Sequence, residues 1–293
     1  MNEYHYKKID AFTSEKSLGN PAACIYLDNG QTIDEDKMQA IARQHKGFVS
    51  EVVFCSKSSR ADYKLVYYSS ECEVDFCGHG TIACMYSLIK STPDLMGKSE
   101  LLIETNSKGV LAVYNRITEQ DAVYITAPDA QHIGTDLSTE LIAENLDLEA
   151  GQVSDKYPID MINAGLRTLI VPVAKLKDEV RVLPDEQQLK DFCINHDIDI
   201  ILIFSQEVAD PSNIAHTRVF APRFGYLEDP ATGSGNSAFG YYMLKNKLWN
   251  GGSISIEQGS ADMEYNIVRL NTRDDKVLFG GRATDRIIGK YLL

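Results

Sequence analysis

The sequence has few cysteines and no recognisable metal-binding motif. Its six cysteines are scattered over 293 residues, which is too few for a disulfide framework. None forms a Cys-x-x-Cys pair suited to zinc, and the six histidines also lie in separate segments, so we expect no metal site. Five of the cysteines are interpreted as buried thiols, and Cys77 is considered separately below.

Long apolar segments and an excess of basic residues are also lacking. The longest apolar stretch, around residues 198–204, is far too short to cross a membrane, and no apolar run follows the N-terminus, so the expected location is the cytoplasm. The chain has 29 basic and 42 acidic residues, a formal net charge of −13. This balance argues against nucleic acid or an anionic membrane as a partner. An acidic substrate must then be attracted by local groups.

Two glycine-rich segments half a chain apart resemble each other. The segment from Cys77 to Tyr86 matches the segment from Thr232 to Tyr241 at an offset of 155 residues, with both glycines, the alanine and the tyrosine in common. The repeat indicates a duplicated architecture, and the length allows two domains of about 130 to 150 residues. Each segment leads into an apolar, helix-length stretch. Through their N–H groups and positive dipole ends, the two helix starts should together bind the carboxylate of an acidic substrate, which we expect to lie between them.

The pattern of apolar residues predicts the elements that surround these segments. A capping box of Thr32 and Glu35 should begin a helix. The expected strands are residues 6–12, 22–27, 48–55, 62–69 and 217–224. The two helices after the glycine-rich segments are expected at residues 81–90 and 239–248.

Glu51 stands out in the predicted strand 48–55. Its parity places it on the same face as Val49, Val53 and Cys55, where a carboxylate is unusual. The pattern leaves two interpretations open. Glu51 is either a charge at a strand end that points to solvent, or a desolvated carboxylate whose raised pKa lets it take and return a proton near neutral pH.

Four motifs together resemble the PhzF-type phenazine-biosynthesis family. Their order and spacing match that family over essentially the whole chain, and the last motif is long and specific. The motifs are Gly19-Asn20-Pro21-Ala22, Ser50-Glu51, Cys77-Gly78-His79-Gly80-Thr81, and Phe220-Ala221-Pro222-Arg223 followed by Glu228-Asp229-Pro230-Ala231-Thr232-Gly233-Ser234.

The resemblance implies an α+β fold shared with diaminopimelate epimerase and proline racemase. In that fold two pseudo-symmetric domains each wrap a sheet around a central helix, and they face each other across an active-site cleft. The domains expected here are residues 1–127, with the segment from about 280 to 293 considered as a completion, and residues 128–279. The resemblance also implies a homodimeric, cofactor-independent isomerase that moves a proton on a small carboxylate substrate.

The resemblance assigns roles to residues by position. Glu51 corresponds to the family's proton-shuttling glutamate, and His79, Asp229 and Ser234 correspond to its other polar cleft residues. The residues expected to contact or shape the substrate site are Asn20, Gly78, Gly80, Thr232, Gly233, Ser234 and Gly235.

Two alternatives stay open beside this isomerase. Racemases of this fold use two thiols, but here Cys77 occupies the first position and Thr232 the second. An unassisted threonine hydroxyl is too weak a base for a symmetric two-base reaction. Cys77, whose place at a helix N-terminus should lower its pKa, could instead begin a dehydration, as in hydroxyproline dehydratases with a cysteine and threonine pair. The second alternative is a protein that binds a metabolite or a partner without turnover.

Overall fold

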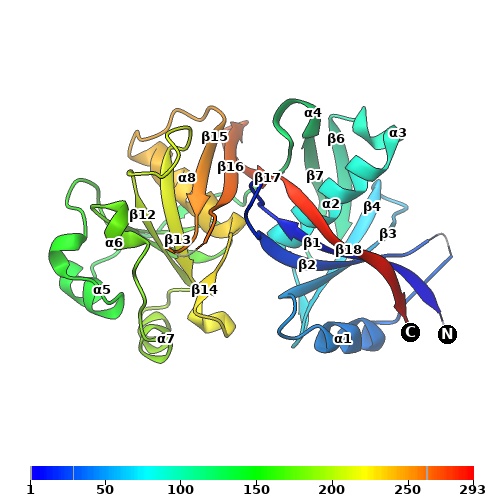
Figure 1. The fold of residues 1–293 in the computed structure, drawn as a ribbon, viewed down its shortest axis with the longest axis horizontal. Coiled ribbons are helices and arrows are strands. Elements are labelled where there is room, and N and C mark those ends of the chain that lie inside the picture. The colour runs from blue at the N-terminus through cyan, green and yellow to red at the C-terminus, as the bar shows by residue number, and fades with distance from the viewer. Residues whose placement is uncertain (1, 29, 262) are drawn as a thin grey trace. The chain divides into compact units, whose positions relative to one another are not determined.

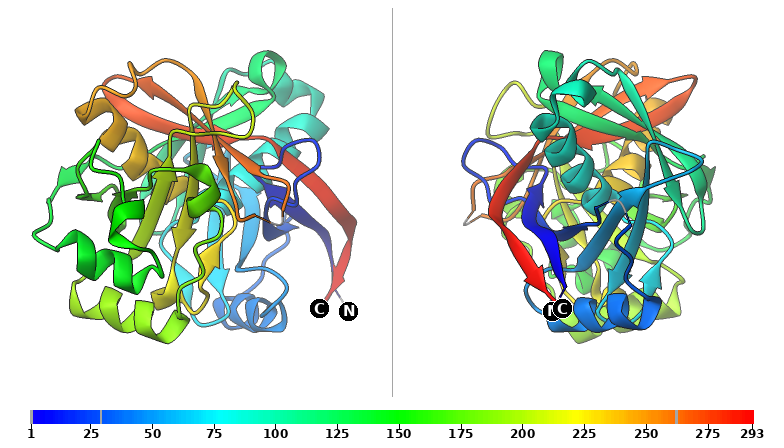
Figure 2. Two further views of the ribbon diagram at one scale, coloured as in Figure 1. Left: turned by 60° about the vertical axis from the view of Figure 1, so that its left-hand side comes forward. Right: turned by 90° about the vertical axis from the view of Figure 1, so that its right-hand side faces the viewer.

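The computed structural model describes residues 2–28, 30–261 and 263–293, and it divides the chain into two compact units. Unit 1 comprises Met1–Thr126 and Gly280–Leu293, and unit 2 comprises Ala127–Phe279. The two ends of the chain lie side by side in unit 1 (Figures 1 and 2). Asn2 and Leu293 exchange backbone hydrogen bonds of 2.8 and 2.9 Å, which continue the antiparallel pairing of the first and last strands.

Unit 1 is built from short helices and strands around one long helix. Its elements are β1 (Glu3–Ala11), β2 (Asn20–Tyr26), α1 (Glu35–Gln44), β3 (Glu51–Lys57), β4 (Tyr63–Ser69), β5 (Glu73–Val74), α2 (Gly78–Ser91), α3 (Pro93–Met96), β6 (Glu100–Thr105), β7 (Gly109–Arg116), α4 (Ile117–Gln120), β8 (Ala122–Thr126) and β18 (Ala283–Leu292).

Unit 2 follows a similar order. Its elements are β9 (Gln131–His132), α5 (Thr139–Asn145), η1 (Ala150–Gln152), β10 (Asp160–Asn163), β11 (Arg167–Pro172), α6 (Leu176–Glu179), α7 (Glu186–Asn195), β12 (Ile200–Ser205), β13 (Ala215–Phe220), η2 (Pro222–Phe224), β14 (Glu228–Asp229), α8 (Gly233–Lys245), β15 (Ile254–Gln258), β16 (Asn266–Arg273) and β17 (Lys276–Gly281), through which the chain leaves the unit.

The strand pairings repeat in the same order in both units. In unit 1, β2 is parallel to β3, β3 antiparallel to β4, β4 antiparallel to β5 and parallel to β6, and β6 antiparallel to β7. In unit 2, the corresponding sequence of pairings runs through β11, β12, β13, β14, β15 and β16 with the same directions. This repetition supports the duplication that the two glycine-rich segments predicted.

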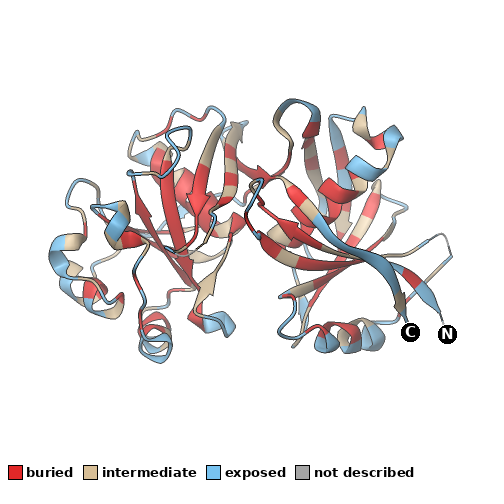
Figure 3. Ribbon diagram, in the orientation of Figure 1, coloured by how far each residue is buried: buried red, intermediate tan, exposed pale blue. Residues whose placement is uncertain are grey.

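Each unit has one helix that is buried on nearly all sides. In unit 1 this is α2, which contacts β1, β2, β3, β7, β8 and β18, and in unit 2 it is α8, which contacts β10, β11, β12 and β16. Figure 3 shows both helices mostly buried, whereas α1 exposes one face. Both buried helices are rich in small and apolar residues all round, as expected for a helix enclosed by a sheet. The predicted central helices are therefore confirmed.

Several element boundaries differ from the sequence-based expectation. Helix α1 begins after Asp34, whose side chain accepts a hydrogen bond from the Lys37 N–H, so the capping box of Thr32 was wrong. Strand β3 begins at Glu51 because residues 45–49 form a turn closed by backbone bonds to the His45 carbonyl. Strand β13 ends at Phe220 because a 3₁₀ turn starts at Pro222.

The glycine-rich segments are the first turns of their helices rather than loops before them. Helix α2 begins at Gly78 and α8 at Gly233, with Cys77 and Thr232 as extended N-cap residues. The N–H groups of the first helical residues have no intrahelical partner, so they are available to a capping side chain or to an anion. Among the cysteines interpreted as buried thiols, Cys72 is exposed, which corrects that interpretation.

No helix in the described part of the chain is long and apolar enough to cross a membrane.

Gly80 allows α2 to approach the sheet of unit 1 closely. A Cβ atom at this position would lie 2.8 Å from the Val53 Cγ2 atom, which is closer than real Cβ contacts allow, and 3.0 Å from the Cys77 Sγ atom, which is tighter than most of them. A side chain would therefore push the helix away from β3 or displace the Cys77 thiol. The backbone at Gly97, by contrast, has open space around it and no left-handed dihedral angle.

We expect Gly80→Ala to reduce the free energy of unfolding by about 1–3 kcal/mol, as overpacking of a core does. Gly97→Ala, the matched control in the same unit, should change stability by less than about 0.5 kcal/mol. Chemical denaturation of the two variants measures both values. An unchanged stability for Gly80→Ala would show that the helix is free to move outward.

Candidate active site

Glu51 is the first residue of β3, where two neighbouring strands hold it in place. β3 pairs in parallel with β2 and antiparallel with β4, with Glu51 opposite Ser69. Its side chain is 19% exposed, so it is largely withdrawn from water rather than pointing into solvent. Because the next inward residue, Val53, is fully buried beneath α2, the carboxylate stands at the end of an apolar strand face.

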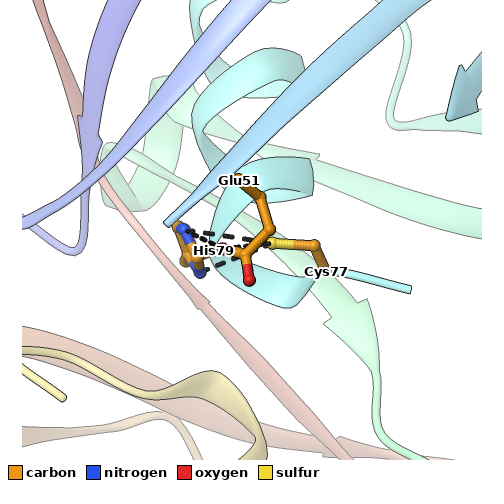
Figure 4. Close-up of side chains that lie close together, drawn as sticks. All are labelled: Glu51, Cys77 and His79. Atoms are coloured by element: carbon orange, nitrogen blue, oxygen red, sulfur yellow. Dashed lines mark hydrogen bonds and ion pairs between the residues drawn. The ribbon is translucent and has the colours of Figure 1, made fainter. Parts of the chain in front are cut away.

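Three functional groups of unit 1 meet at the start of α2 (Figure 4). The His79 Nε2 atom lies 3.3 Å from the Glu51 Oε2 atom, and the Cys77 Sγ atom lies 3.8 Å from the same oxygen. The Cys77 sulfur also lies 3.5 Å from Nδ1 and 3.9 Å from Nε2 of His79. Strand β3 supplies the carboxylate, and the N-cap and the second residue of α2 supply the thiol and the imidazole.

Burial raises the pKa of Glu51 from its ordinary value of 4.5 to about 7, and the hydrogen bond from Cys77 opposes part of that rise. Desolvation disfavours the charged carboxylate, whereas a donor to the carboxylate favours it. A group with a pKa of about 7 exists in both protonation states near neutral pH. Of the two interpretations of Glu51, the desolvated carboxylate with a raised pKa therefore describes this residue, and the charge that points to solvent does not.

The N-cap of α2 fixes the Cys77 side chain. Its sulfur accepts a hydrogen bond of 3.3 Å from the Gly80 N–H, as an N-cap side chain does. Behind it, the Thr81 hydroxyl donates to the Cys77 carbonyl at 2.7 Å and lies 2.7 Å from the buried Tyr67 hydroxyl. These contacts anchor the glycine-rich turn to β4, so the thiol has little freedom to move.

Asn20 lies at the start of β2, at the same end of the β2–β3 pair as Glu51. Its segment is held by an ion pair that the sequence did not indicate. Arg286 of β18 donates to the buried carboxylate of Asp10 at 2.8 Å and to the Ser17 carbonyl at 2.9 Å. Gly19, with φ of +75°, makes the turn that leads into the strand.

The glycine-rich segment of unit 2 is organised by amide groups. Thr232 is the N-cap of α8, but its side chain makes no capping hydrogen bond. Instead the Thr232 N–H donates to the Gln258 Oε1 atom at 3.0 Å, and the Gln258 Nε2 atom donates to the Asp229 carbonyl at 2.9 Å. Asn236 also donates to Gln258 Oε1, at 2.8 Å. Ser234 is half-buried one residue inside the helix.

A buried arginine holds the strand that precedes this segment. Arg218, 2% exposed in β13, binds both carboxylate oxygens of Glu228 at 2.9 and 2.8 Å. Its remaining nitrogen donates to the carbonyl groups of Glu179 and Val182 at 3.0 and 2.6 Å. Bidentate pairing fixes a carboxylate in orientation as well as in position, so Arg218 sets the course of β14 and of Asp229.

The structure brings together Glu51, Cys77 and His79, and it places Asn20 on the neighbouring strand of unit 1. Asp229, Thr232, Gly233, Ser234 and Gly235 lie together at the start of α8 in unit 2. Gln258 and Arg218 were missed. Gln258 shares a strand face with Ile254 and Ile256, so its signal was the one that identified Glu51, a polar residue among apolar ones. Arg218 lies in a strand with two other polar residues and gave no such signal.

Comparison with known proteins identifies the family. The model of the phenazine biosynthesis-like protein family, PhzC-PhzF, matches residues 9–289, and the chain belongs to this family. It is 32% identical over 263 residues to the uncharacterized isomerase YfhB of Bacillus subtilis, covering 88% of this chain and 87% of that protein.

Solved structures agree with this placement. The crystal structure of the phenazine biosynthesis protein of the PhzF family from Bacillus anthracis matches with a TM-score of 0.86 and 26% identity over 100% of both chains. A probable proline racemase from Agrobacterium radiobacter matches with a TM-score of 0.64 and 11% identity, covering 99% of this chain and 93% of that one, which shows the fold alone. The fold is thus the diaminopimelate epimerase-like fold that the motifs implied.

The raised pKa of Glu51 makes the stability of the protein depend on pH in a definite direction. The folded state holds a proton on Glu51 up to about pH 7, whereas the unfolded chain loses it near 4.5. The unfolded state therefore binds fewer protons between these values, and stability falls as pH rises through this window. The loss is on the order of 3 kcal/mol at most.

Glu51→Gln removes this penalty, so we expect the variant to be more stable than the native protein above pH 7 and to lose the advantage towards pH 4.5. Thermal unfolding across this range measures the difference between the two proteins. Glu71→Gln, which removes an exposed carboxylate of the same unit, should give no gain at high pH. A Glu51→Gln effect that is constant with pH would contradict the desolvated carboxylate.

Gln258→Ala tests the amide cluster of unit 2. It leaves the buried Thr232 N–H without its acceptor and removes one of the two acceptors of the Asn236 amide, at about 1–3 kcal/mol for each unsatisfied N–H. We expect a loss of at least about 2 kcal/mol in the free energy of unfolding, measured with denaturant. The control is Gln187→Ala on the exposed face of α7, which should be nearly neutral. Equal effects of the two substitutions would show that the cluster does not hold α8.

Proposed function

We propose that this protein is a cofactor-independent isomerase that moves a proton on a small carboxylate substrate, with Glu51 as the acid and base. The observation that carries the proposal is the largely buried Glu51 carboxylate beside His79 and Cys77 at the start of α2. A carboxylate that only binds a ligand has no need of an apolar strand face. The names of relatives, among them an uncharacterized isomerase of Bacillus subtilis, support the same class of reaction.

The chemistry follows from the groups in unit 1. As the carboxylate, Glu51 removes a proton from the carbon next to the substrate's carboxylate, and as the carboxylic acid it returns that proton to another position. The His79 Nε2 atom, 3.3 Å from the Glu51 oxygen, is placed to orient the carboxylate. The substrate's carboxylate is assigned to the start of α2, where N–H groups and the helix dipole stabilise the negative charge that develops.

The second candidate is a dehydratase or racemase-like enzyme that uses Cys77. One observation favours it: the thiol lies 3.5 Å from the His79 imidazole, an arrangement that can activate a nucleophile or base. In unit 2, however, the Thr232 hydroxyl accepts a hydrogen bond from the Gln258 amide, a group that cannot remove a proton from it. A symmetric pair of bases is therefore disfavoured.

Exchange of solvent deuterium into a panel of small carboxylic acids, followed by NMR, tests the proposal. Glu51→Gln keeps the shape of the side chain but removes the base, so exchange should fall by about 10²-fold to 10⁴-fold. Cys77→Ser should cost much less, and Glu71→Gln should have no effect. A large loss with Cys77→Ser and a small one with Glu51→Gln would favour the Cys77 enzyme. A protein that binds one of these acids without exchanging its protons would be a binding protein.

A further inference from the structure

The cluster of Glu51, Cys77 and His79 contains three different donor atoms that metal ions use. In the described part of the chain, each of these three residues offers one ligand atom, and the three atoms all lie within 4.8 Å of one another. Sequence reasoning gave no metal site because these ligands come from two segments, 26 residues apart for Glu51 and Cys77. Cys-x-x-Cys spacing cannot reveal such a group.

The distances among the donor atoms are close to those in the coordination sphere of zinc. The separations are 3.3 Å between His79 Nε2 and Glu51 Oε2, 3.8 Å between Cys77 Sγ and that oxygen, and 3.9 Å between Sγ and Nε2. A tetrahedral zinc ion with its usual bond lengths requires about 3.3 Å between nitrogen and oxygen, and about 3.5 Å from sulfur to either. The nearest point equidistant from the three atoms lies in their plane, about 2.1 Å from each, so a tetrahedral ion requires the sulfur to move about 0.3–0.4 Å towards the other two atoms.

The surroundings of the cluster also suit a metal ion. The three side chains are 19%, 6% and 13% exposed for Glu51, Cys77 and His79, so they are shielded but reachable. The Gly80 N–H donates to the Cys77 sulfur, the kind of outer contact that orients a metal-bound thiolate. A thiolate with an imidazole selects zinc and similar transition metals over magnesium and calcium, which prefer oxygen ligands alone.

We propose that Glu51, Cys77 and His79 bind one Zn²⁺ ion, or a transition-metal ion of similar preference, and that this ion competes with proton transfer. The ion would bind Glu51 as the carboxylate and prevent it from taking up a proton, and three protein ligands would leave a further coordination position open to water. The metal is therefore a reversible inhibitor of this site and not a cofactor. Metal binding is measured without substrate, so this inference and the proposed function can fail separately.

Titration of the chelator-treated, full-length protein with Co²⁺ and with Zn²⁺ tests the inference. We expect one Co²⁺ per chain with a thiolate-to-cobalt charge-transfer band, which Zn²⁺ displaces. Since altering outer contacts of a metal site costs about 10–100-fold in affinity, removing a ligand should cost about 100-fold or more. Glu51→Gln, Cys77→Ser and His79→Gln should each show this loss, and Cys77→Ser should also abolish the band. The matched controls are Glu71→Gln, Cys72→Ser and His5→Gln, which change exposed residues of the same unit. These three variants should bind Co²⁺ with unchanged affinity.

A measurement on the native protein covers the case in which a variant fails to fold. Zn²⁺ should protect Cys77 from alkylation and leave the exposed Cys72 reactive, as mass spectrometry of the modified peptides would show. Absence of the charge-transfer band, a band that survives Cys77→Ser, or unprotected Cys77 would overturn the inference. If metal binds as described and deuterium exchange is absent, the proposed function alone is wrong.

Discussion

The withdrawal of the Glu51 carboxylate from water is the constraint on which the chemistry of unit 1 depends. A carboxylate in an apolar setting loses solvation, and the protein retains it through the contacts with His79 and Cys77 while its pKa rises to about 7. Water is excluded from this carboxylate because α2 packs closely against β3. Gly80 permits this close approach because it has no Cβ atom to clash with Val53. The glycine-rich turn therefore shapes the proton affinity of a residue on another element.

The two units share a scaffold but differ in what occupies the N-cap of the buried helix. In unit 1 the Cys77 sulfur caps α2 and contacts the carboxylate and the imidazole. In unit 2 the Thr232 side chain makes no capping hydrogen bond, and the buried Gln258 amide oxygen accepts a hydrogen bond from the Thr232 N–H. Duplication has thus preserved the order of strand pairing while the N-cap of the buried helix is a thiol in one copy and a threonine in the other. This asymmetry favours chemistry with a single acid and base over a two-base racemase.

The sequence was sufficient for the fold because the informative features were local or repeated. The two glycine-rich segments, the apolar strands and the family motifs predicted the duplicated α+β architecture and its two buried helices. The boundaries were less predictable because short-range competition decided them. Asp34, and not Thr32, is the N-cap of α1. The turn after α1 includes residues that were predicted to begin β3, so the strand starts three residues later, at Glu51.

The candidate site was predictable where the alternation of side chains along a strand placed a charged residue on an apolar face, as at Glu51. It was less predictable where two residues that form an ion pair are distant in sequence. Asp10 and Arg286 are separated by 276 residues, and no periodicity indicates their ion pair. Gln258 gave the same signal as Glu51, a polar side chain among inward apolar positions, whereas Arg218 follows two other polar residues in its strand and gave none. The pattern does not say which of these residues reacts and which positions a backbone group, because that depends on the partners that the fold supplies.

The cluster at the start of α2 is suited to two incompatible uses of the same lone pairs. Proton transfer by Glu51 requires a carboxylate that can take up and release a proton, whereas a metal ion shared with the Cys77 sulfur and the His79 nitrogen would hold it deprotonated. The geometry that positions His79 to orient the carboxylate also places Nε2 at the separation that a shared metal ion requires. A serine at position 77 would keep a side chain at the N-cap of α2 while removing the soft ligand. The thiol is thus the group that separates the two uses, because Glu51 and His79 serve both.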